Sequence, residues 1–196
     1  MVTALLALGA NMPSGTGGPE TTLEAALAHL PDMDTRVLAT SSWYRTAAVP
    51  AGSGPDFVNG AAAVGTVLTP EALLARLHEI EAGFGRVRRT RWAPRVCDID
   101  IIAYGSLVRP DAEEQARWAG LPPDQASAAT PEELILPHPR MQERAFVLVP
   151  LAEVAPGWRH PVTGLSVREM CDALPQHERA EIRPLSPAGR QSGDSG

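Results

Sequence analysis

The stretch Arg91-Trp92-Ala93-Pro94-Arg95-Val96-Cys97-Asp98-Ile99-Asp100-Ile101-Ile102 joins an arginine-rich segment to a run of alternating acidic and branched apolar residues. In an extended strand, side chains at i and i+2 point to the same face, so Asp98 and Asp100 share one face and the intervening isoleucines take the other. Mg²⁺ is commonly held by one or two carboxylates together with substrate phosphates. The stretch therefore predicts a site for a metal-bound polyphosphate. The alternative is a half-buried strand whose acidic face is only solvated.

The segments before this strand alternate between strand and helix patterns. Runs rich in apolar, β-branched and aromatic residues, bounded by Gly and Pro, predict strands over residues 2–8, 35–46, 57–67 and 96–104. A helical apolar period covers 20–30, and Thr69-Pro70-Glu71 starts a second helix that continues to about residue 84. The order β-α-β-β-α-β is typical of a ferredoxin-like α+β fold, in which we expect an antiparallel sheet with helices on one face.

The rest of the chain adds elements to this pattern. Helices are predicted over 139–153 and 166–174 as C-terminal additions, and a short helix over 111–118 should end before Leu121-Pro122-Pro123. Residues 186–196 are rich in Ser, Gly and Pro without an apolar period, which predicts a disordered tail. The length of 196 residues fits one domain over 1–185.

Composition excludes several classes of protein and of mechanism. The net charge of −6 argues against a general role in binding nucleic acid or a membrane surface, and no apolar run approaches the length of a membrane span. All 17 basic residues are Arg, so the chain has neither a phosphate-binding lysine nor a Schiff-base lysine. Two cysteines form no disulfide framework or zinc pattern, and Cys97 should face the core. We expect a cytoplasmic monomer whose phosphate ligands are arginines, backbone amides and metal.

Seven further blocks accompany the acidic strand, in an order that resembles a known family. They are Leu8-Gly9-Ala10-Asn11, Ser41-Ser42-Trp43-Tyr44-Arg45-Thr46, Pro55-Asp56-Phe57-Val58-Asn59, Ile80-Glu81, Gly85-Arg86-Val87-Arg88, Leu136-Pro137-His138 and Arg144-Ala145-Phe146. With the stretch from Arg91 to Ile102 they resemble the 6-hydroxymethyl-7,8-dihydropterin pyrophosphokinases of folate biosynthesis. The resemblance implies transfer of pyrophosphate from ATP to the pterin alcohol, with AMP as the second product.

The resemblance also implies roles for individual residues on the nucleotide side. Two Mg²⁺ ions would be held by Asp98 and Asp100, which match the metal ligands of the family. The implied catalytic residues are Arg86, Arg95, Asp98 and Asp100, and the implied nucleotide contacts are Glu81, Arg88, Arg95, Ile101, His138 and Arg144. Alternatives stay open for some of them: Arg86 and Arg88 could lie in a solvated loop, and Glu81 could form a structural ion pair.

Pterin recognition would fall to a second set of residues, in which flat apolar faces are combined with a few polar groups. The matching positions are Thr46, Ala47, Val49, Phe57, Asn59, Trp92 and Phe146. Trp92 and Phe146 match the residues that sandwich the ring, although Phe146 taken alone would be a core residue. The chain departs from the family pattern at Phe57 (often Tyr), Pro139 (often aromatic) and Glu133 (often basic).

The acidic segment 110–133 is longer than the family pattern and is predicted to be an insertion, which either packs beside the nucleotide site or stays mobile and contributes no catalytic groups. Two alternatives to the enzyme are a ferredoxin-like RNA-binding module and a catalytically inactive pterin-binding homologue. The net charge of −6 counts against the RNA-binding module. The presence of Asp98, Asp100, Arg95 and Asn59, which match the family pattern, counts against the inactive homologue.

Overall fold

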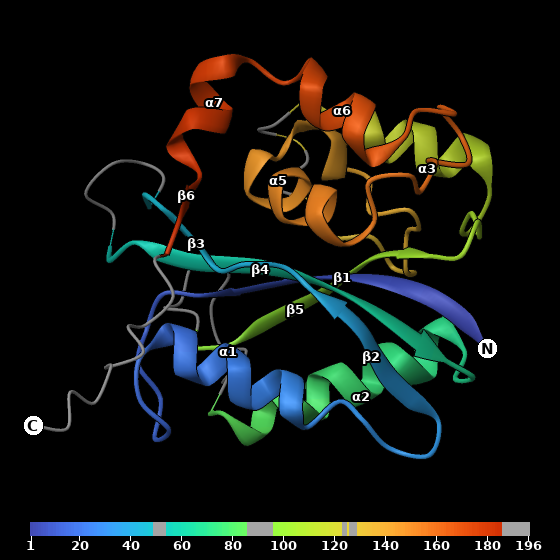
Figure 1. Ribbon diagram of the computed structural model, residues 1–196. Helices are drawn as coiled ribbons and strands as arrows, with labels where there is room; N and C mark the ends of the chain where they lie inside the picture. The colour runs from blue at the N-terminus through green and yellow to red at the C-terminus, as the bar shows by residue number, and fades with distance from the viewer. Residues whose placement is uncertain (49–53, 86–95, 123–124, 126–128, 186–196) are drawn as a thin grey trace, which may run out of the picture.

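A single antiparallel sheet organises the chain (Figure 1). The computed structural model describes residues 1–48, 54–85, 96–122, 125 and 129–185. Its strands are β1 (Val2–Ala10), β2 (Thr35–Thr40), β3 (Tyr44–Thr46), β4 (Phe57–Thr66), β5 (Asp98–Tyr104) and β6 (Arg183–Pro184). The order is β5-β1-β4-β3-β6, and β2 also pairs with β4. This arrangement confirms the predicted hairpin and the α+β class.

The predicted strand over 35–46, the first of the hairpin, is split into β2 and β3, which pair with successive parts of β4. At the break, Ser41 makes two hydrogen bonds to the backbone of Ala61: its amide donates to the carbonyl, and its Oγ accepts from the amide, both at 2.9 Å. The Ser41 hydroxyl thus accepts the hydrogen bond that a backbone carbonyl would accept in a regular pair of strands. The C-terminal β6, which the sequence did not predict, pairs with β3.

Helices α1 (Pro19–Ala28) and α2 (Pro70–Gly83) cover one face of the sheet (Figure 1). Both begin with a proline, which suits the first helical position because its missing amide would have no partner there. Thr69 caps α2 as predicted, since its Oγ1 accepts from the Ala72 amide at 3.2 Å. Leu23 and Leu77 are among the fully buried side chains that join this helix layer to the sheet.

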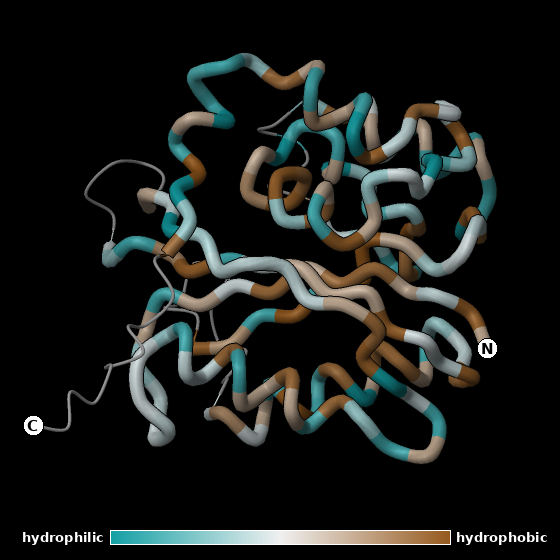
Figure 2. The backbone as a smooth tube through the Cα atoms, in the orientation of Figure 1, coloured by the Kyte–Doolittle hydropathy of each residue, from teal (hydrophilic) through white to brown (hydrophobic). Residues whose placement is uncertain are grey.

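The two helices of the β-α-β-β-α-β pattern thus share one face, as expected, and the helices predicted as C-terminal additions over 139–153 and 166–174 cover the opposite face. This second layer contains the 3₁₀ turn η1 (Met141–Glu143) and helices α5 (Ala145–Val154), α6 (Val167–Ala173) and α7 (Gln176–Glu181). Its buried side chains form a separate core with Leu5, Ala61, Ala63 and Ile102 of the sheet. Figure 2 shows hydrophobic stretches in the strands and in α5 above them. Strand β4 is accordingly buried on both faces from Val58 to Thr66.

The predicted short helix in the insertion is present as α3 (Ala112–Ala119). Asp111 caps it by accepting from the Glu114 amide at 2.9 Å, and the helix ends before Gly120. Cys97 is buried in the core, as expected. No helix of the described residues has the length and apolar character needed to cross a bilayer. The predicted tail at 186–196 lies outside the described residues.

Candidate active site

Asp98 and Asp100 lie on β5 and face the α5 layer. The alternate residues Ile99 and Ile101 belong to the core formed with α1 and α2, and successive strand residues point to opposite faces. On the neighbouring strand β1 the aspartates are paired with small residues, Asp98 with Gly9 and Asp100 with Ala7. Asp98 is only 7 % exposed, whereas Asp100 is half-buried. Two carboxylates therefore share one face beside two residues that leave room above the sheet.

A row of residues runs across the sheet from these carboxylates to Asn59. In the strand register Gly9 pairs with Asp98 on one side and with Asn59 on the other. A Cβ atom at Gly9 would lie 3.0 Å from Asn59 Oδ1, so the glycine permits this close approach. Asn59 is buried, and its Nδ2 donates to Thr46 Oγ1 at 2.8 Å. Two strand spacings separate Asp98 from Asn59, which corresponds to about 10 Å.

His138 approaches the carboxylates from the segment before η1. Its amide donates to the Ile102 carbonyl at 2.8 Å, and its Nδ1 accepts from the Arg140 amide at 3.1 Å. Burial, with the guanidinium groups of Arg144 and Arg140, lowers the pKa of His138 to about 3, although Asp98 acts in the opposite direction. The imidazole is therefore neutral near pH 7. Because Nδ1 is an acceptor, the proton is on Nε2, which can donate to a ligand.

Arg144 and Phe146 lie at the start of α5. The guanidinium carbon of Arg144 is 5.7 Å from the centroid of the Phe146 ring, within the range of a cation–π contact. Phe146 is 39 % exposed, although the residues on either side of it are buried. An aromatic ring that is open to solvent between two buried neighbours is available to stack with a flat ligand, so its interpretation as a core residue is wrong.

Glu81 supports the acidic strand from α2. Its side chain is buried, and Oε1 accepts from the Ile99 amide at 2.7 Å. This contact fixes the backbone between Asp98 and Asp100. It is a structural role in the site, and a contact between Glu81 and a nucleotide stays a prediction.

Tyr44 and Glu153 form a link that the sequence did not reveal. The Tyr44 hydroxyl donates to Glu153 Oε1, and the Ser42 amide donates to Glu153 Oε2 at 2.7 Å. Burial and then the Glu153 carboxylate raise the pKa of the Tyr44 phenol above its usual range. The link ties β3, which carries Thr46, to α5, which carries Phe146. Tyr44 lies in one of the quoted sequence blocks, but no local pattern connects it with Glu153.

The other predicted site residues are distributed as follows. Thr46 and Phe57 are paired at the end of the β3–β4 hairpin and are half-buried, whereas the adjacent Ala47 is exposed. The Ile101 side chain lies in the core, on the opposite face from the aspartates. Five residues lie outside the described residues, namely Val49, Arg86, Arg88, Trp92 and Arg95.

The donor set suits a hard cation that is also bound by phosphate. Within the described residues there is no group of three or more His, Cys, Asp and Glu side chains that could form a protein cage for a metal. Two carboxylates on one face, Asp98 and Asp100, fit Mg²⁺, which keeps several waters and takes further oxygen ligands from substrate phosphates.

The sequence profile of the 7,8-dihydro-6-hydroxymethylpterin-pyrophosphokinase family matches residues 5–156. The chain belongs to this family. It is 40 % identical over 173 residues to a 2-amino-4-hydroxy-6-hydroxymethyldihydropteridine pyrophosphokinase of Methylorubrum extorquens, covering 86 % of this chain and 91 % of that one. A Haemophilus influenzae enzyme of the same name is 32 % identical, covering 94 % of this chain and all of that one.

Other relatives of the pyrophosphokinase family are longer than this chain. A Synechocystis pyrophosphokinase is 38 % identical over 147 residues, which are 75 % of this chain and 63 % of the relative. The fold resembles that of wild-type Plasmodium falciparum HPPK-DHPS with pteroate, with a TM-score of 0.61 at 14 % identity. That match covers 87 % of this chain and 44 % of the Plasmodium chain. The structural likeness supports the α+β fold of the family.

Proposed function

We propose that this chain transfers the pyrophosphoryl group of ATP to 6-hydroxymethyl-7,8-dihydropterin in folate biosynthesis. In this reaction the pterin hydroxyl oxygen forms a bond to the β-phosphorus, the bond from the β-phosphorus to the α,β-bridging oxygen breaks, and AMP leaves while the hydroxyl proton is released. The observation that carries the proposal is the row on one sheet face that joins Asp98, Gly9 and Asn59. The support is that Asp98, which we assign to the phosphate side, and Asn59, which we assign to the pterin side, are about 10 Å apart in this register.

On the nucleotide side, the acidic pair would hold the magnesium ions, for which we propose a count of two. Bound there, the metal would supply positive charge against the phosphate oxygens. The neutral His138 would donate from Nε2 and Arg144 would add charge, with Arg86, Arg88 and Arg95 assigned from the sequence. The nucleotide contacts predicted for Glu81 and Ile101 stay predictions, because Glu81 accepts from the Ile99 amide and the Ile101 side chain lies in the core on the opposite face.

On the pterin side, Asn59 would read the polar edge of the ring while aromatic side chains cover its faces. The support is that Asn59 is buried and oriented by Thr46, and that the Phe146 ring is exposed. The remaining proposed contacts are Ala47, Val49, Phe57 and Trp92. The hydrogen bond between Tyr44 and Glu153 would hold β3, which carries Thr46, next to α5, which carries Phe146.

We also propose that the protein acts in the cytoplasm as a monomer.

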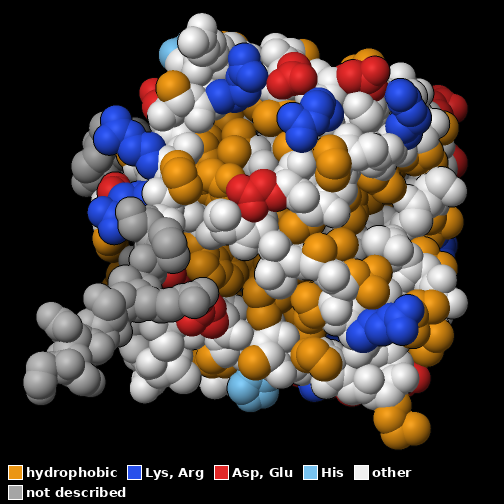
Figure 3. Space-filling model, in the orientation of Figure 1, with side chains coloured by type: hydrophobic (Ala, Val, Ile, Leu, Met, Phe, Trp, Pro, Cys, Tyr) orange, Lys and Arg blue, Asp and Glu red, His pale blue; other side chains and the backbone are white. Residues whose placement is uncertain are grey.

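The RNA-binding alternative is not favoured by the charge of the protein. The net charge is −6, and the face shown in Figure 3 has interspersed charges of both signs.

The test is an assay of AMP release by the purified chain with ATP, Mg²⁺ and 6-hydroxymethyl-7,8-dihydropterin. We expect AMP and the pterin diphosphate in equal amounts, and no AMP when either the pterin or Mg²⁺ is omitted. AMP release that does not depend on the pterin would contradict the assignment. Pterin binding without any turnover would identify the inactive homologue, and salt-dependent RNA affinity would identify the RNA-binding module.

A further inference from the structure

We propose that Gln115, in helix α3 of the insertion, is a positioning residue for the nucleotide side of the active site. It acts through the carbonyl of Pro137 and so sets the position of His138. The proposal rests on the proposed function, because it takes His138 as a nucleotide contact.

Gln115 is buried in a helix that is otherwise directed to solvent. Within α3, all of whose residues the structure describes, it is the one buried residue, with 2 % of its surface exposed. Its Nε2 donates to the Pro137 carbonyl at 3.2 Å, and the contact is buried. A polar side chain is costly to bury without a partner, so this hydrogen bond accounts for a glutamine at the inner position of α3.

The Pro137 carbonyl belongs to the segment 136–138, in which each residue is held by a hydrogen bond to another part of the chain. Leu136 exchanges two backbone hydrogen bonds with Arg109, at 2.9 and 3.1 Å, and the His138 amide donates to Ile102 at 2.8 Å. Proline has no amide hydrogen, so the carbonyl is the backbone group through which Pro137 can be held. Gln115 therefore supplies the hydrogen bond at the middle of the three residues, directly before His138.

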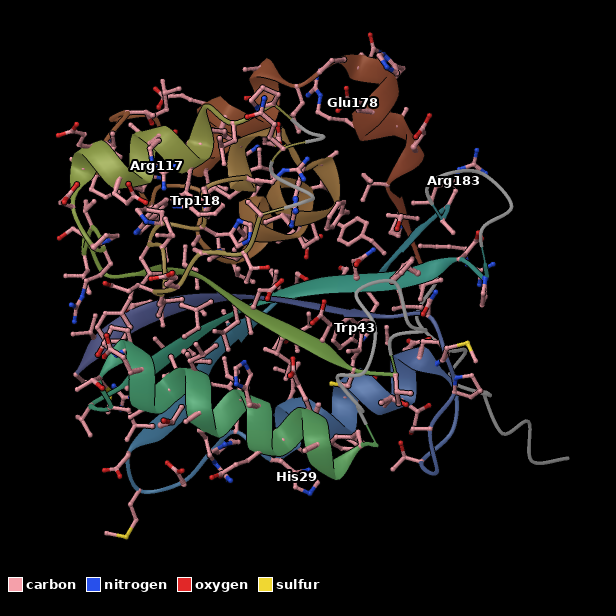
Figure 4. All side chains as sticks on the ribbon, turned by 180° about the vertical axis from the view of Figure 1, so that it is seen from behind. His29, Trp43, Arg117, Trp118, Glu178 and Arg183 are labelled. Atoms are coloured by element: carbon pink, nitrogen blue, oxygen red, sulfur yellow. The ribbon has the colours of Figure 1, made fainter. Side chains whose placement is uncertain are left out.

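Helix α3 is stabilised by contacts that do not involve Gln115. Asp111 caps its first turn, and Glu114 accepts from Trp118 Nε1 at 2.8 Å and pairs with Arg117. The Arg117 guanidinium lies 5.2 Å from the Trp118 ring (Figure 4). Since these local contacts hold the helix, the bond from Gln115 is a contact between the helix and the His138 segment, and it can be removed without removing the helix.

The experiment compares Gln115→Met, which is close in length but has no donor, with Glu113→Gln on the exposed side of the same helix. We expect the KM for ATP of Gln115→Met to rise about 3- to 10-fold, the range for loss of one hydrogen bond, with kcat and the pterin KM within about twofold. Glu113→Gln should match the wild type. If Gln115→Met does not fold, Gln115→Asn, whose side chain is too short for the bond, replaces it.

An unchanged ATP KM in a folded variant would overturn the proposal, and so would a fall in kcat together with a rise in both KM values, which is the pattern of general destabilisation. Calorimetric binding of α,β-methylene ATP with Mg²⁺ gives a readout that does not require turnover. A wild-type protein that binds this analogue but releases no AMP would refute the proposed function. The affinity difference between wild type and Gln115→Met would still decide the role of Gln115.

Discussion

Asp98 and Asp100 are held in position by contacts on three sides. Glu81 holds the Ile99 amide between them, and Gly9 and Ala7 leave open space beside them on β1. The isoleucines on the other face anchor the strand in the core. The acidic pair is thus fixed by the backbone of β5, which suits a site that must hold its ligands in one geometry.

The acidic pair should be essential for turnover. Asp98→Asn and Asp100→Asn keep the shape of the side chain but remove its negative charge, and we expect each to lower kcat by about 100-fold or more at saturating ATP. AMP release measures the effect, while circular dichroism and thermal melting check the fold. The exposed Glu113→Gln serves as the control. Turnover within about twofold of the wild type in either variant would remove the metal assignment.

Tyr44 should make the stability of the fold sensitive to alkaline pH. Its phenol has a raised pKa in the folded chain, so the folded state favours the protonated form more strongly than the unfolded state does. The contribution of this residue is complete below the unfolded pKa of about 10 and is lost as pH rises above it toward the folded pKa.

We therefore expect the unfolding free energy of the wild type to fall above about pH 10 more steeply than that of Tyr44→Phe. Urea denaturation at several pH values measures both slopes. Parallel slopes for the two proteins would show that folding does not raise the pKa of Tyr44.

At the scale of elements, local sequence signals predicted most of the helices and strands, although not the short helix α7 or the short strand β6. Thr69 and Pro70 marked the start of α2, and the alternation after Cys97 marked β5. The pairing of β6 with β3 and the bond from Gln115 to Pro137 depend on contacts between distant residues. Such contacts leave no periodic pattern, so single-sequence reasoning could not find them.

The break between β2 and β3 depends on a glycine in β4. Trp43, at the break, packs over Gly60 so closely that a Cβ atom there would lie 2.5 Å from two atoms of the indole ring (Figure 4). We expect Gly60→Ala to destabilise the fold by about 1–3 kcal/mol, because the ring must move out of a packed position.

Chemical denaturation measures this loss, and Gly83→Ala provides a matched control. A Cβ atom at Gly83, the last residue of α2, would meet nothing within 4 Å, so that substitution should stabilise the helix by about 0.5–1 kcal/mol. Equal stability of Gly60→Ala and the wild type would mean that Trp43 does not need this space.

For the whole molecule, the helices of the second layer were predicted over 139–153 and 166–174, but their position on the opposite face of the sheet was not, although the sequence contains its signal. In β4 the run Gly60-Ala61-Ala62-Ala63-Val64 is apolar at consecutive positions, which indicates burial on both faces and not the alternation of a half-exposed strand. Helix α5 is apolar nearly all round, as expected of a helix between two layers. The ordered sequence blocks identified the candidate site residues. Their positions relative to one another could be determined only from the strand register of the structure.

The insertion connects these scales, because α3 lies on the same side of the sheet as α5 and α6 (Figure 1) and contacts the His138 segment through Gln115. Replacing residues 113–129 with a short Gly/Ser bridge should leave the strands and both helix layers intact. We expect measurable pyrophosphokinase activity, a lower melting temperature and an ATP KM raised at least as much as in Gln115→Met, because both changes remove the partner of the Pro137 carbonyl. Steady-state kinetics and thermal melting measure these effects. Complete loss of activity in a folded deletion variant would show that the insertion supplies groups to the reaction, beyond the position of one carbonyl.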